Sequence, residues 1–229
     1  MADVDGDGRP DLVTGSDDCC DQEPGFHWFR RGADGRFTAK GEVRVRVAGL
    51  PPGPAGEIPR YRMTVRLADW DSDGGLDVLA VDTRSKGRVA RTRGRWDADE
   101  GAVEAADEVE GSPAASEVSA QPVVVDWDGD GRLDLVTADH ALATPDAPAY
   151  TCRVWWQRNE GGTGPPRLGP RQLLTSFENP GPAVGLDAAD LDGSGRPGLL
   201  LAVKLPSRGR PFRTAVWYYP RRPAAAIRP

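Results

Sequence analysis

Short apolar, β-prone stretches alternate along the whole chain with clusters of Asp, Gly and Arg. Gly and Pro account for 28 and 21 of the 229 residues, which is too much turn chemistry for a helical bundle. Four of the clusters stand next to such stretches. The stretches before them are 63–68, 122–125 and 184–189, and the stretches after them are 12–14, 78–81, 135–137 and 199–203. The pattern predicts strand, loop and strand in each copy.

The four clusters are copies of one pattern and align without gaps. They read DVDGDGRPDLV from Asp3, DWDSDGGLDVL from Asp69, DWDGDGRLDLV from Asp126 and DLDGSGRPGLL from Asp190. We number their first nine residues as positions 1 to 9 of loop 1, loop 2, loop 3 and loop 4. The copies begin about 60 residues apart, a period typical of repeated supersecondary units.

Two further strands are predicted in each repeat. An aromatic strand follows in three copies, as FHWFRR, VWWQR and VWYY, whereas the second copy has only residues 88–92 at that place. A turn rich in Gly or Asn then leads to a fourth short strand, as in ADGRF ending at Phe37 in the first copy and NEGGTGPPRL ending at Leu168 in the third. Each repeat is therefore predicted to be a four-stranded antiparallel sheet, and the chain an all-β propeller with four visible blades in a single domain, 1–229.

The loops have the composition of calcium sites. Asp at positions 1, 3, 5 and 9 gives four carboxylates that would repel one another, and Gly at position 6 permits the positive φ of a tight turn. A hard dication removes the repulsion, and all-oxygen ligands of flexible geometry favour Ca²⁺ over Mg²⁺ and Zn²⁺. The predicted side-chain ligands are Asp3, Asp5, Asp7 and Asp11 in loop 1, Asp69, Asp71, Asp73 and Asp77 in loop 2, and Asp126, Asp128, Asp130 and Asp134 in loop 3. The backbone carbonyls of Arg9, Gly75 and Arg132, at position 7, are predicted as further ligands.

Loop 4 is expected to bind calcium weakly or not at all. Ser194 replaces the Asp of position 5 and Gly198 that of position 9, so only Asp190 and Asp192 remain. Position 2 is apolar in all four loops, and we expect it to point into the protein. An Asp and Gly turn held by hydrogen bonds alone is the alternative to a metal site. An EF-hand is excluded, because its position 12 requires a Glu that precedes a helix, and here that position lies in strand-like sequence.

These loops, the strands beside them and the aromatic strands resemble the FG-GAP/VCBS repeat family, which is related to the integrin-α β-propeller. The resemblance covers essentially the whole chain and is degraded in the fourth copy. It implies a calcium-stabilised propeller, commonly of seven blades, in secreted or surface proteins. Four repeats are fewer than seven, so the chain is interpreted as part of a larger ring or as a small propeller. In the second case a tail strand near 224–227 could complete the first blade.

Composition and charge narrow the partners. The formal net charge is −6, but three loops alone hold twelve aspartates, so the acidity is local. No apolar run is long enough to cross a bilayer, and no motif supports nucleic acid, so neither membrane insertion nor a nucleic-acid partner is expected. The first residues, MADVDGDGRPD, show no secretory signal, which fits either a cytosolic chain or a trimmed one. In an oxidising compartment, Cys19 or Cys20 could pair with Cys152; three unpaired thiols are the alternative.

Two functional classes follow from these patterns. The first is a secreted or surface module that binds carbohydrate or a surface protein, with Trp28, Trp155, Trp156 and Trp217 as candidate stacking platforms for sugars. Packing between sheets is the other explanation for these four residues. The second class is an accessory or catalytic propeller of a polysaccharide-active lyase or hydrolase. Binding ranks first because the aspartates of the loops already serve metal. The acidic segment 97–110 is expected to be a solvated loop or short helix.

Overall fold

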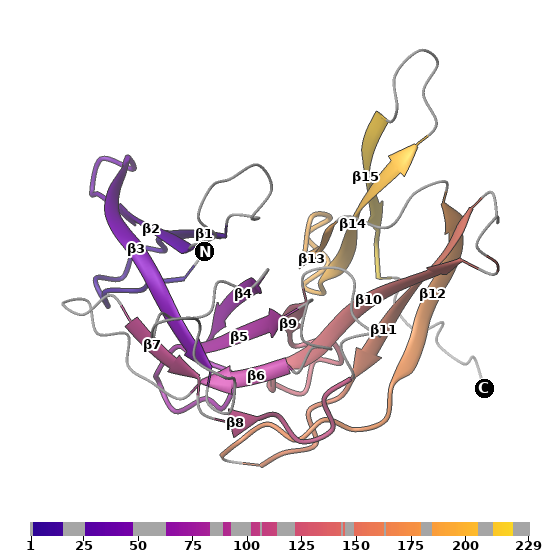
Figure 1. The fold of residues 1–229 in the computed structure, drawn as a ribbon, viewed down its shortest axis with the longest axis horizontal. Coiled ribbons are helices and arrows are strands. Elements are labelled where there is room, and N and C mark those ends of the chain that lie inside the picture. Colours follow the sequence, from indigo (N-terminus) through magenta and orange to yellow (C-terminus); the bar gives the residue numbers. More distant parts are fainter. Residues whose placement is uncertain are drawn as a thin grey trace, which may run out of the picture. The chain divides into compact units, whose positions relative to one another are not determined.

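Every regular element in the described part of the chain is a β-strand (Figure 1). The computed structural model describes residues 2–15, 26–47, 63–82, 89–92, 102–105, 107–113, 122–142, 144, 149–162, 164–179, 185–205 and 213–221. The chain forms two compact units, Met1–Ser116 with Gly161–Arg167, and Glu117–Glu160 with Leu168–Pro229. Among the described residues, no helix is long and apolar enough to cross a membrane. The prediction of an all-β fold is therefore confirmed.

The first unit contains two sheets. One has the strand order β1-β2-β3-β7 and the other β4-β5-β6-β8. Their strands are β1 (Leu12–Gly15), β2 (Phe26–Arg31), β3 (Phe37–Val47), β4 (Met63–Ala68), β5 (Asp77–Asp82), β6 (Val89–Thr92), β7 (Ala102–Ala105) and β8 (Asp107–Glu108). All pairings are antiparallel except that of β3 with β7.

The second unit also contains two sheets, both antiparallel. Their strand orders are β12-β11-β10-β9 and β13-β14-β15. The strands are β9 (Val123–Val125), β10 (Asp134–Leu142), β11 (Tyr150–Gln157), β12 (Gln172–Asn179), β13 (Gly185–Ala189), β14 (Gly198–Leu205) and β15 (Arg213–Tyr219). Loops 3 and 4 connect the first two strands of these sheets, as loop 2 connects β4 to β5.

The core of the second unit lies between its two sheets. Side chains alternate across a strand, so one face of each sheet is apolar and the two apolar faces pack together. The buried cluster is Val123, Trp127, Val136, Ala138 and Val154 from the first sheet with Leu186, Leu199, Leu201 and Val203 from the second. Leu201 and Val203 are fully buried. Truncating such a Leu to Ala costs about 2–5 kcal/mol, so this packing fixes the positions of loops 3 and 4 at the strand ends.

The strands that flank the loops lie where the sequence predicts them, whereas the prediction for the acidic segment is wrong. The predicted fourth strand follows the turn as β3, which begins at Phe37, in the first repeat and as β12, which begins at Gln172, in the third, where Leu168 itself makes an isolated bridge with Asn159. The acidic segment 97–110 contains β7 and β8 rather than only loop or helix. Backbone hydrogen bonds to β3 and β6 hold these short strands, and such partners cannot be read from local sequence.

The blades also differ from four identical antiparallel sheets. The β13-β14-β15 sheet has three strands among the described residues, and the first sheet ends in the parallel pair β3–β7. A parallel pairing needs a long crossover, which the segment from β4 to β6 supplies. Among the described residues next to loop 1, Ala2 forms an isolated antiparallel bridge with Asp11. A closed ring of blades is not seen among the described residues, and a single domain stays a prediction. The possible tail strand at 224–227, Cys19 and Cys20 lie outside the described residues, while Cys152 is buried in β11.

Candidate metal centres

The backbone of each loop is a tight curl that depends on glycine. Position 6 has a left-handed φ in all four loops, 81° at Gly8, 84° at Gly74, 87° at Gly131 and 75° at Gly195. Glycine adopts this conformation without steric cost. Position 4 is also left-handed, and there loop 2 has Ser72, with φ of 58°, where the other three loops have glycine. Loop 2 therefore carries backbone strain that the other loops avoid.

Three loops bring carboxylates together. In each of loops 1, 2 and 3, the aspartates of positions 1, 3 and 9 each place an oxygen within 4.8 Å of the other two. The groups are Asp3, Asp5 and Asp11; Asp69, Asp71 and Asp77; and Asp126, Asp128 and Asp134. The donor set is all oxygen and carries three negative charges, which suits a hard cation.

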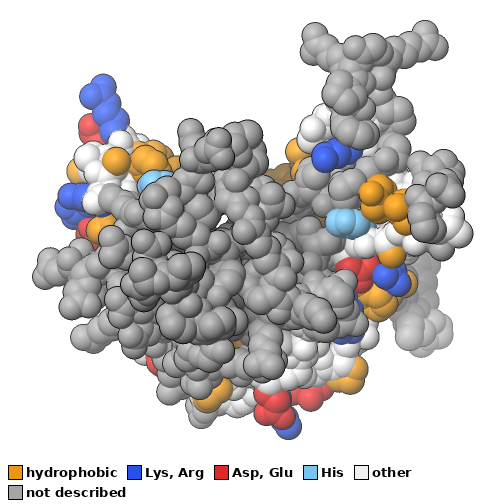
Figure 2. Space-filling model, in the orientation of Figure 1, with side chains coloured by type: hydrophobic (Ala, Val, Ile, Leu, Met, Phe, Trp, Pro, Cys, Tyr) orange, Lys and Arg blue, Asp and Glu red, His pale blue; other side chains and the backbone are white. Residues whose placement is uncertain are grey.

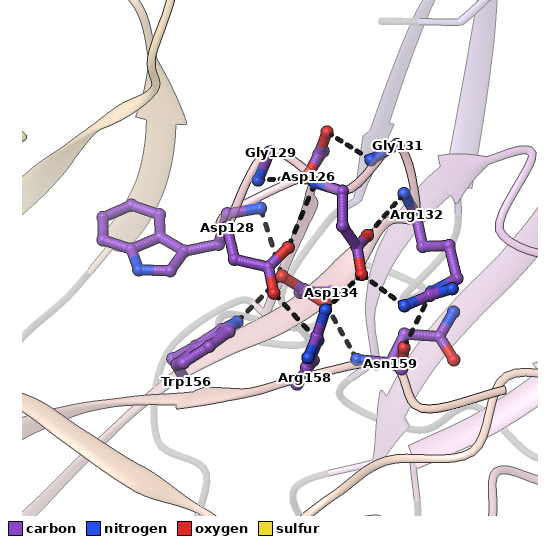
Figure 3. Close-up of polar contacts among 11 residues, drawn as sticks. Asp126, Asp128, Gly129, Gly131, Arg132, Asp134, Trp156, Arg158 and Asn159 are labelled. Atoms are coloured by element: carbon purple, nitrogen blue, oxygen red, sulfur yellow. Dashed lines mark hydrogen bonds and ion pairs between the residues drawn. The ribbon is translucent and has the colours of Figure 1, made fainter.

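The aspartate of position 9 is the buried anchor of the loop. Asp134 is fully buried, and its carboxylate accepts the N–H of Trp127 at 3.2 Å, the N–H of Asn159 at 2.8 Å and the indole Nε1–H of Trp156 at 2.9 Å (Figure 3). Burial, with the neighbouring charge of Asp128, raises the pKa of Asp134 although those hydrogen bonds lower it. A cation beside this carboxylate would offset the cost of burying its charge.

Loop 1 repeats this arrangement. Asp11 is fully buried and accepts the N–H of Val4 at 3.3 Å, the N–H of Arg31 at 2.7 Å and the indole Nε1–H of Trp28 at 3.0 Å. In loop 2, Asp77 accepts the N–H of Trp70 at 3.0 Å. The aspartate of position 9 thus joins the loop to the aromatic strand in the same way in the first and third repeats.

The aspartate of position 1 caps the turn with its side chain. Asp3 accepts the N–H of Asp7 at 3.0 Å on Oδ1 and that of Gly8 at 2.7 Å on Oδ2. Asp126 does the same for Asp130 and Gly131, at 3.1 and 3.0 Å. In loop 2, Asp69 Oδ2 accepts the N–H of Gly74 at 3.2 Å.

One carboxylate oxygen in loop 2 tests whether the residues fit a metal ion. Asp69 Oδ1 is buried and has no hydrogen-bond partner within the described structure. A buried anionic oxygen without a partner is costly, and this one belongs to a group of three converging carboxylates. The residues of loop 2 therefore fit a hard cation.

The aspartate of position 5 faces arginines in loops 1 and 3. Asp130 forms ion pairs with Arg132 of its own loop and with Arg158, which directly follows β11 (Figure 3). Asp7 pairs in the same way with Arg9 and with Arg30 of β2. These carboxylates lie outside the groups of three described above, and their role as metal ligands stays a prediction, as does that of Asp73. The predicted carbonyl ligands of position 7 also stay predictions.

The arginines control the charge state of position 5. Burial by itself would raise the pKa of Asp7, but the hydrogen bond from Arg30, the N–H of Arg9 and the two guanidinium charges together lower it. Burial likewise opposes the N–H of Arg132 and the guanidinium groups at Asp130, and the pKa of Asp130 is lowered overall. Both carboxylates are therefore ionised at neutral pH.

The pattern of these loops is matched by a known family. A family model described as FG-GAP-like repeat matches residues 3–80 and again residues 69–137. The chain belongs to the FG-GAP-like repeat family. Each match runs from position 1 of one loop to just beyond position 9 of the next, so loops 1, 2 and 3 lie in the matched residues and loop 4 lies outside them. No curated protein matches the sequence.

Loop 4 of this FG-GAP-like chain keeps the turn but lacks the carboxylate group. Asp190 accepts the N–H groups of Ser194 and Gly195 at 3.0 and 2.8 Å, as position 1 does elsewhere. Asp192 accepts the N–H of Ser194 at 3.0 Å. Leu191 at position 2 is 61% exposed, so the prediction that this residue points into the protein is wrong for loop 4. The buried counterparts are Val4, Trp70 and Trp127.

The structure gives the predicted stacking tryptophans other contacts. Trp28 is buried, and both Trp28 and Trp156 donate to the aspartate of position 9. Trp155 donates to the buried Asp139 at 2.7 Å, and the guanidinium of Arg171 lies 4.4 Å from its ring centroid. Trp217 packs against Phe177, with ring centroids 5.4 Å apart. A role of these residues in sugar binding stays a prediction.

Sequence reasoning missed the link between the aromatic strand and the loop. The signal was present as Trp-x-Arg in the first and third repeats, at 28–30 and 156–158. In both repeats the indole of the Trp donates to the aspartate of position 9, and the guanidinium of the Arg pairs with the aspartates of positions 3 and 5. The backbone N–H of the residue after the Arg also donates to the aspartate of position 9. In the second repeat Arg91 stands at the place of this tryptophan, because it pairs with Leu79 as Trp156 pairs with Val136 in the third repeat.

Proposed function

We propose that this chain is a calcium-stabilised β-propeller-type module of a secreted or surface protein. The observation that carries the proposal is the threefold recurrence of three aspartate carboxylates within 4.8 Å of one another on glycine-dependent loops. Membership of the FG-GAP-like family supports it, because such repeats are typical of β-propeller-like modules in extracellular or surface proteins. The single buried cluster formed by side chains of both sheets in the second unit supports the proposal, because neighbouring blades of a propeller pack face to face.

Calcium is the ion that the ligand set favours. Carboxylate oxygens from positions 1, 3 and 9 leave room for carbonyl and water ligands, and calcium accepts six to eight oxygens in flexible geometry. Magnesium holds its waters and requires a stricter octahedron, and zinc prefers nitrogen or sulfur ligands. The residues would bind the ion and join two strands of one sheet through it. The ion itself supplies charge neutralisation and has no redox role.

The role proposed for the module is recognition of a carbohydrate or of a surface protein. The described acidic and basic side chains lie beside one another on the face drawn in Figure 2, rather than in separate patches. Calcium bound in the loops would stabilise the surface that the sheets present, without entering the ligand contact.

Thermal unfolding tests the metal part of the proposal. A ligand that binds only the folded state stabilises it by RT ln(1 + [L]/Kd), about 2.7 kcal/mol at 100 times Kd. The melting temperature of chelator-treated protein should rise with millimolar CaCl₂ and much less with MgCl₂. Isothermal titration should show up to three sites. An unchanged melting temperature in calcium contradicts structural calcium sites.

A binding assay tests the recognition part. The protein would be applied to a glycan array and to immobilised cell-surface protein fractions, with calcium and with excess chelator. Calcium-dependent retention on one ligand class is the expected result. Absence of retention on every surface, with protein shown to be folded and loaded with calcium, rejects recognition while leaving the metal sites intact.

A further inference from the structure

Loops 1 and 3 are each contacted by a pair of arginines. In loop 3, Arg158 Nε lies 2.8 Å from Asp128 Oδ2 and Arg158 Nη2 lies 2.7 Å from Asp130 Oδ2 (Figure 3). In loop 1, Arg30 Nε lies 2.6 Å from Asp5 Oδ2 and Nη2 lies 2.9 Å from Asp7 Oδ2. One guanidinium therefore bridges positions 3 and 5 in each loop.

The second arginine of each pair comes from position 7 of the loop. Arg132 contacts Asp130 through Nη2 and donates from Nε to the carbonyl oxygen of Asn159 at 3.1 Å. Arg9 contacts Asp7 and donates from Nε to the carbonyl oxygen of Arg31 at 3.2 Å. Loop 2 has Gly75 at this position, which has no side chain. We call the two pairs, Arg9 with Arg30 and Arg132 with Arg158, the arginine clamps.

The clamps change the charge that each loop offers to a cation. Loops 1 and 3 each contain four aspartates and contact two arginines, which leaves two negative charges for a dication to neutralise.

The position of Arg30 and Arg158 makes them competitors of the cation. Each contacts a position-3 aspartate whose carboxylate belongs to the group of three converging oxygens. A positive charge that close stabilises the carboxylates when no metal is bound and repels a dication when one is bound. Both effects favour the metal-free loop over the loaded one.

We propose that the arginine clamps are built-in counter-charges that keep loops 1 and 3 folded without calcium and weaken their calcium affinity. The inference rests on the calcium-binding function proposed above. Loops 1 and 3 therefore keep their shape when calcium is low.

Neutral variants of the bridging arginines test the proposal. Arg30→Gln and Arg158→Gln would each be titrated with CaCl₂ by isothermal calorimetry at low salt. A unit charge about 6 Å from a dication in water changes its affinity by about tenfold, so one of the calcium sites should bind about tenfold more tightly in each variant. The gain should shrink at 0.5 M NaCl, because salt screens the interaction. In excess chelator, both variants should melt at a lower temperature than the wild type.

Matched controls separate the local charge from the overall charge. Arg36→Gln and Arg196→Gln remove the same charge at an exposed turn and in loop 4, and both should titrate like the wild type. Arg158→Lys keeps the positive charge, although lysine cannot bridge two carboxylates. Because the charge is what weakens calcium binding, this variant should have the wild-type affinity. If Arg158→Gln does not fold in chelator, its affinity is measured by withdrawing calcium from the loaded protein with a competing chelator.

Three results overturn the proposal. These are calcium affinity in the Gln variants that is unchanged or weaker, a Lys variant that behaves like the Gln variant, and an unchanged melting temperature in chelator. A wild-type protein that binds no calcium at all overturns the calcium function together with this inference. Normal calcium binding by the wild type with unshifted Gln variants overturns the inference alone.

Discussion

A Cβ atom at Gly198 would lie 2.6 Å from Cε2 of the Tyr218 ring and 2.7 Å from the carbonyl oxygen of Tyr219. Position 9 of loop 4 is therefore closed to any side chain. In loop 3 the same position holds Asp134. Trp156 takes the place in the β10–β11 pairing that Tyr218 takes in the β14–β15 pairing, and its indole donates to Asp134. In loop 4 the Tyr218 ring thus fills the space that a side chain at position 9 would need, so the missing aspartate and the missing tryptophan have one cause in the packing.

Gly198→Asp should destabilise the protein rather than restore a calcium site. The new side chain must displace the Tyr218 ring and the backbone of β15, which costs about 1–3 kcal/mol. Urea unfolding measures the loss, and calorimetry should show no additional calcium site. Gly193→Ala is a control for backbone strain without overlap, since nothing lies within 4 Å of its Cβ. Wild-type stability in Gly198→Asp contradicts this explanation.

Asp134→Ala should destabilise the protein even when no metal is present. The variant leaves three N–H donors, those of Trp127, Trp156 and Asn159, without their acceptor, at a cost of about 3 kcal/mol or more. Asp190→Ala is the matched control in loop 4 and should change stability far less, because Asp190 is exposed and belongs to no carboxylate group. Urea unfolding in excess chelator compares the two. Equal losses would mean that Asp134 matters only through the metal.

Trp156→Phe should separate support of the loop from packing in the core. Phenylalanine keeps most of the apolar ring but removes the indole donor to Asp134, so about 1 kcal/mol of stability should be lost. Trp217→Phe is the control, since its ring packs against Phe177 and touches no loop aspartate by any hydrogen bond shown for the described residues. Calcium affinity should fall only in Trp156→Phe. The same affinity in both variants shows that the indole does not hold the ligand.

Ser72→Gly should stabilise the protein. Ser72 adopts φ of 58°, a conformation that costs a non-glycine residue about 1–2 kcal/mol and glycine nothing. Glycine also gains entropy in the unfolded chain, so the net gain should be about 0.5 kcal/mol. Thermal unfolding in chelator measures it, with Ser112→Gly as a control at a serine that has no positive φ. A lower melting temperature in Ser72→Gly indicates that the serine side chain makes a contact that outweighs the strain.

The protein should lose stability as the pH falls below about 6.5. Burial lowers the pKa of His140 below its ordinary value of 6.5, although the charge of Asp139 raises it. The folded state therefore binds this proton less readily than the unfolded state does, so stability is full above pH 6.5 and falls as the pH drops through the folded pKa. Melting temperatures between pH 7.5 and 5 should show the loss, and His140→Gln should remove it. His27→Gln, at an exposed histidine of β2, is the control. Equal pH dependence in wild type and His140→Gln contradicts the assignment.

The strands and loops of this protein are fixed by local sequence. Apolar stretches beside Asp and Gly loops gave the positions of β4, β9 and β13 before the loops and of β1, β5, β10 and β14 after them. The loops need glycine at position 6 and carboxylates at alternate positions, and both requirements are local, so the pattern can be read along the chain. The same reasoning found the three carboxylate groups and the defect of loop 4.

Tertiary structure alone decided which groups serve each loop from a distance. The arginines that meet Asp7 and Asp130 come from residues 30 and 158, and the indoles that meet Asp11 and Asp134 come from residues 28 and 156. Their contacts depend on the register of antiparallel strands, which sequence spacing does not give, because the turns between these strands differ in length. The parallel strand β7 has the same origin, since its partner β3 lies more than fifty residues earlier and is chosen by the packing of the sheet.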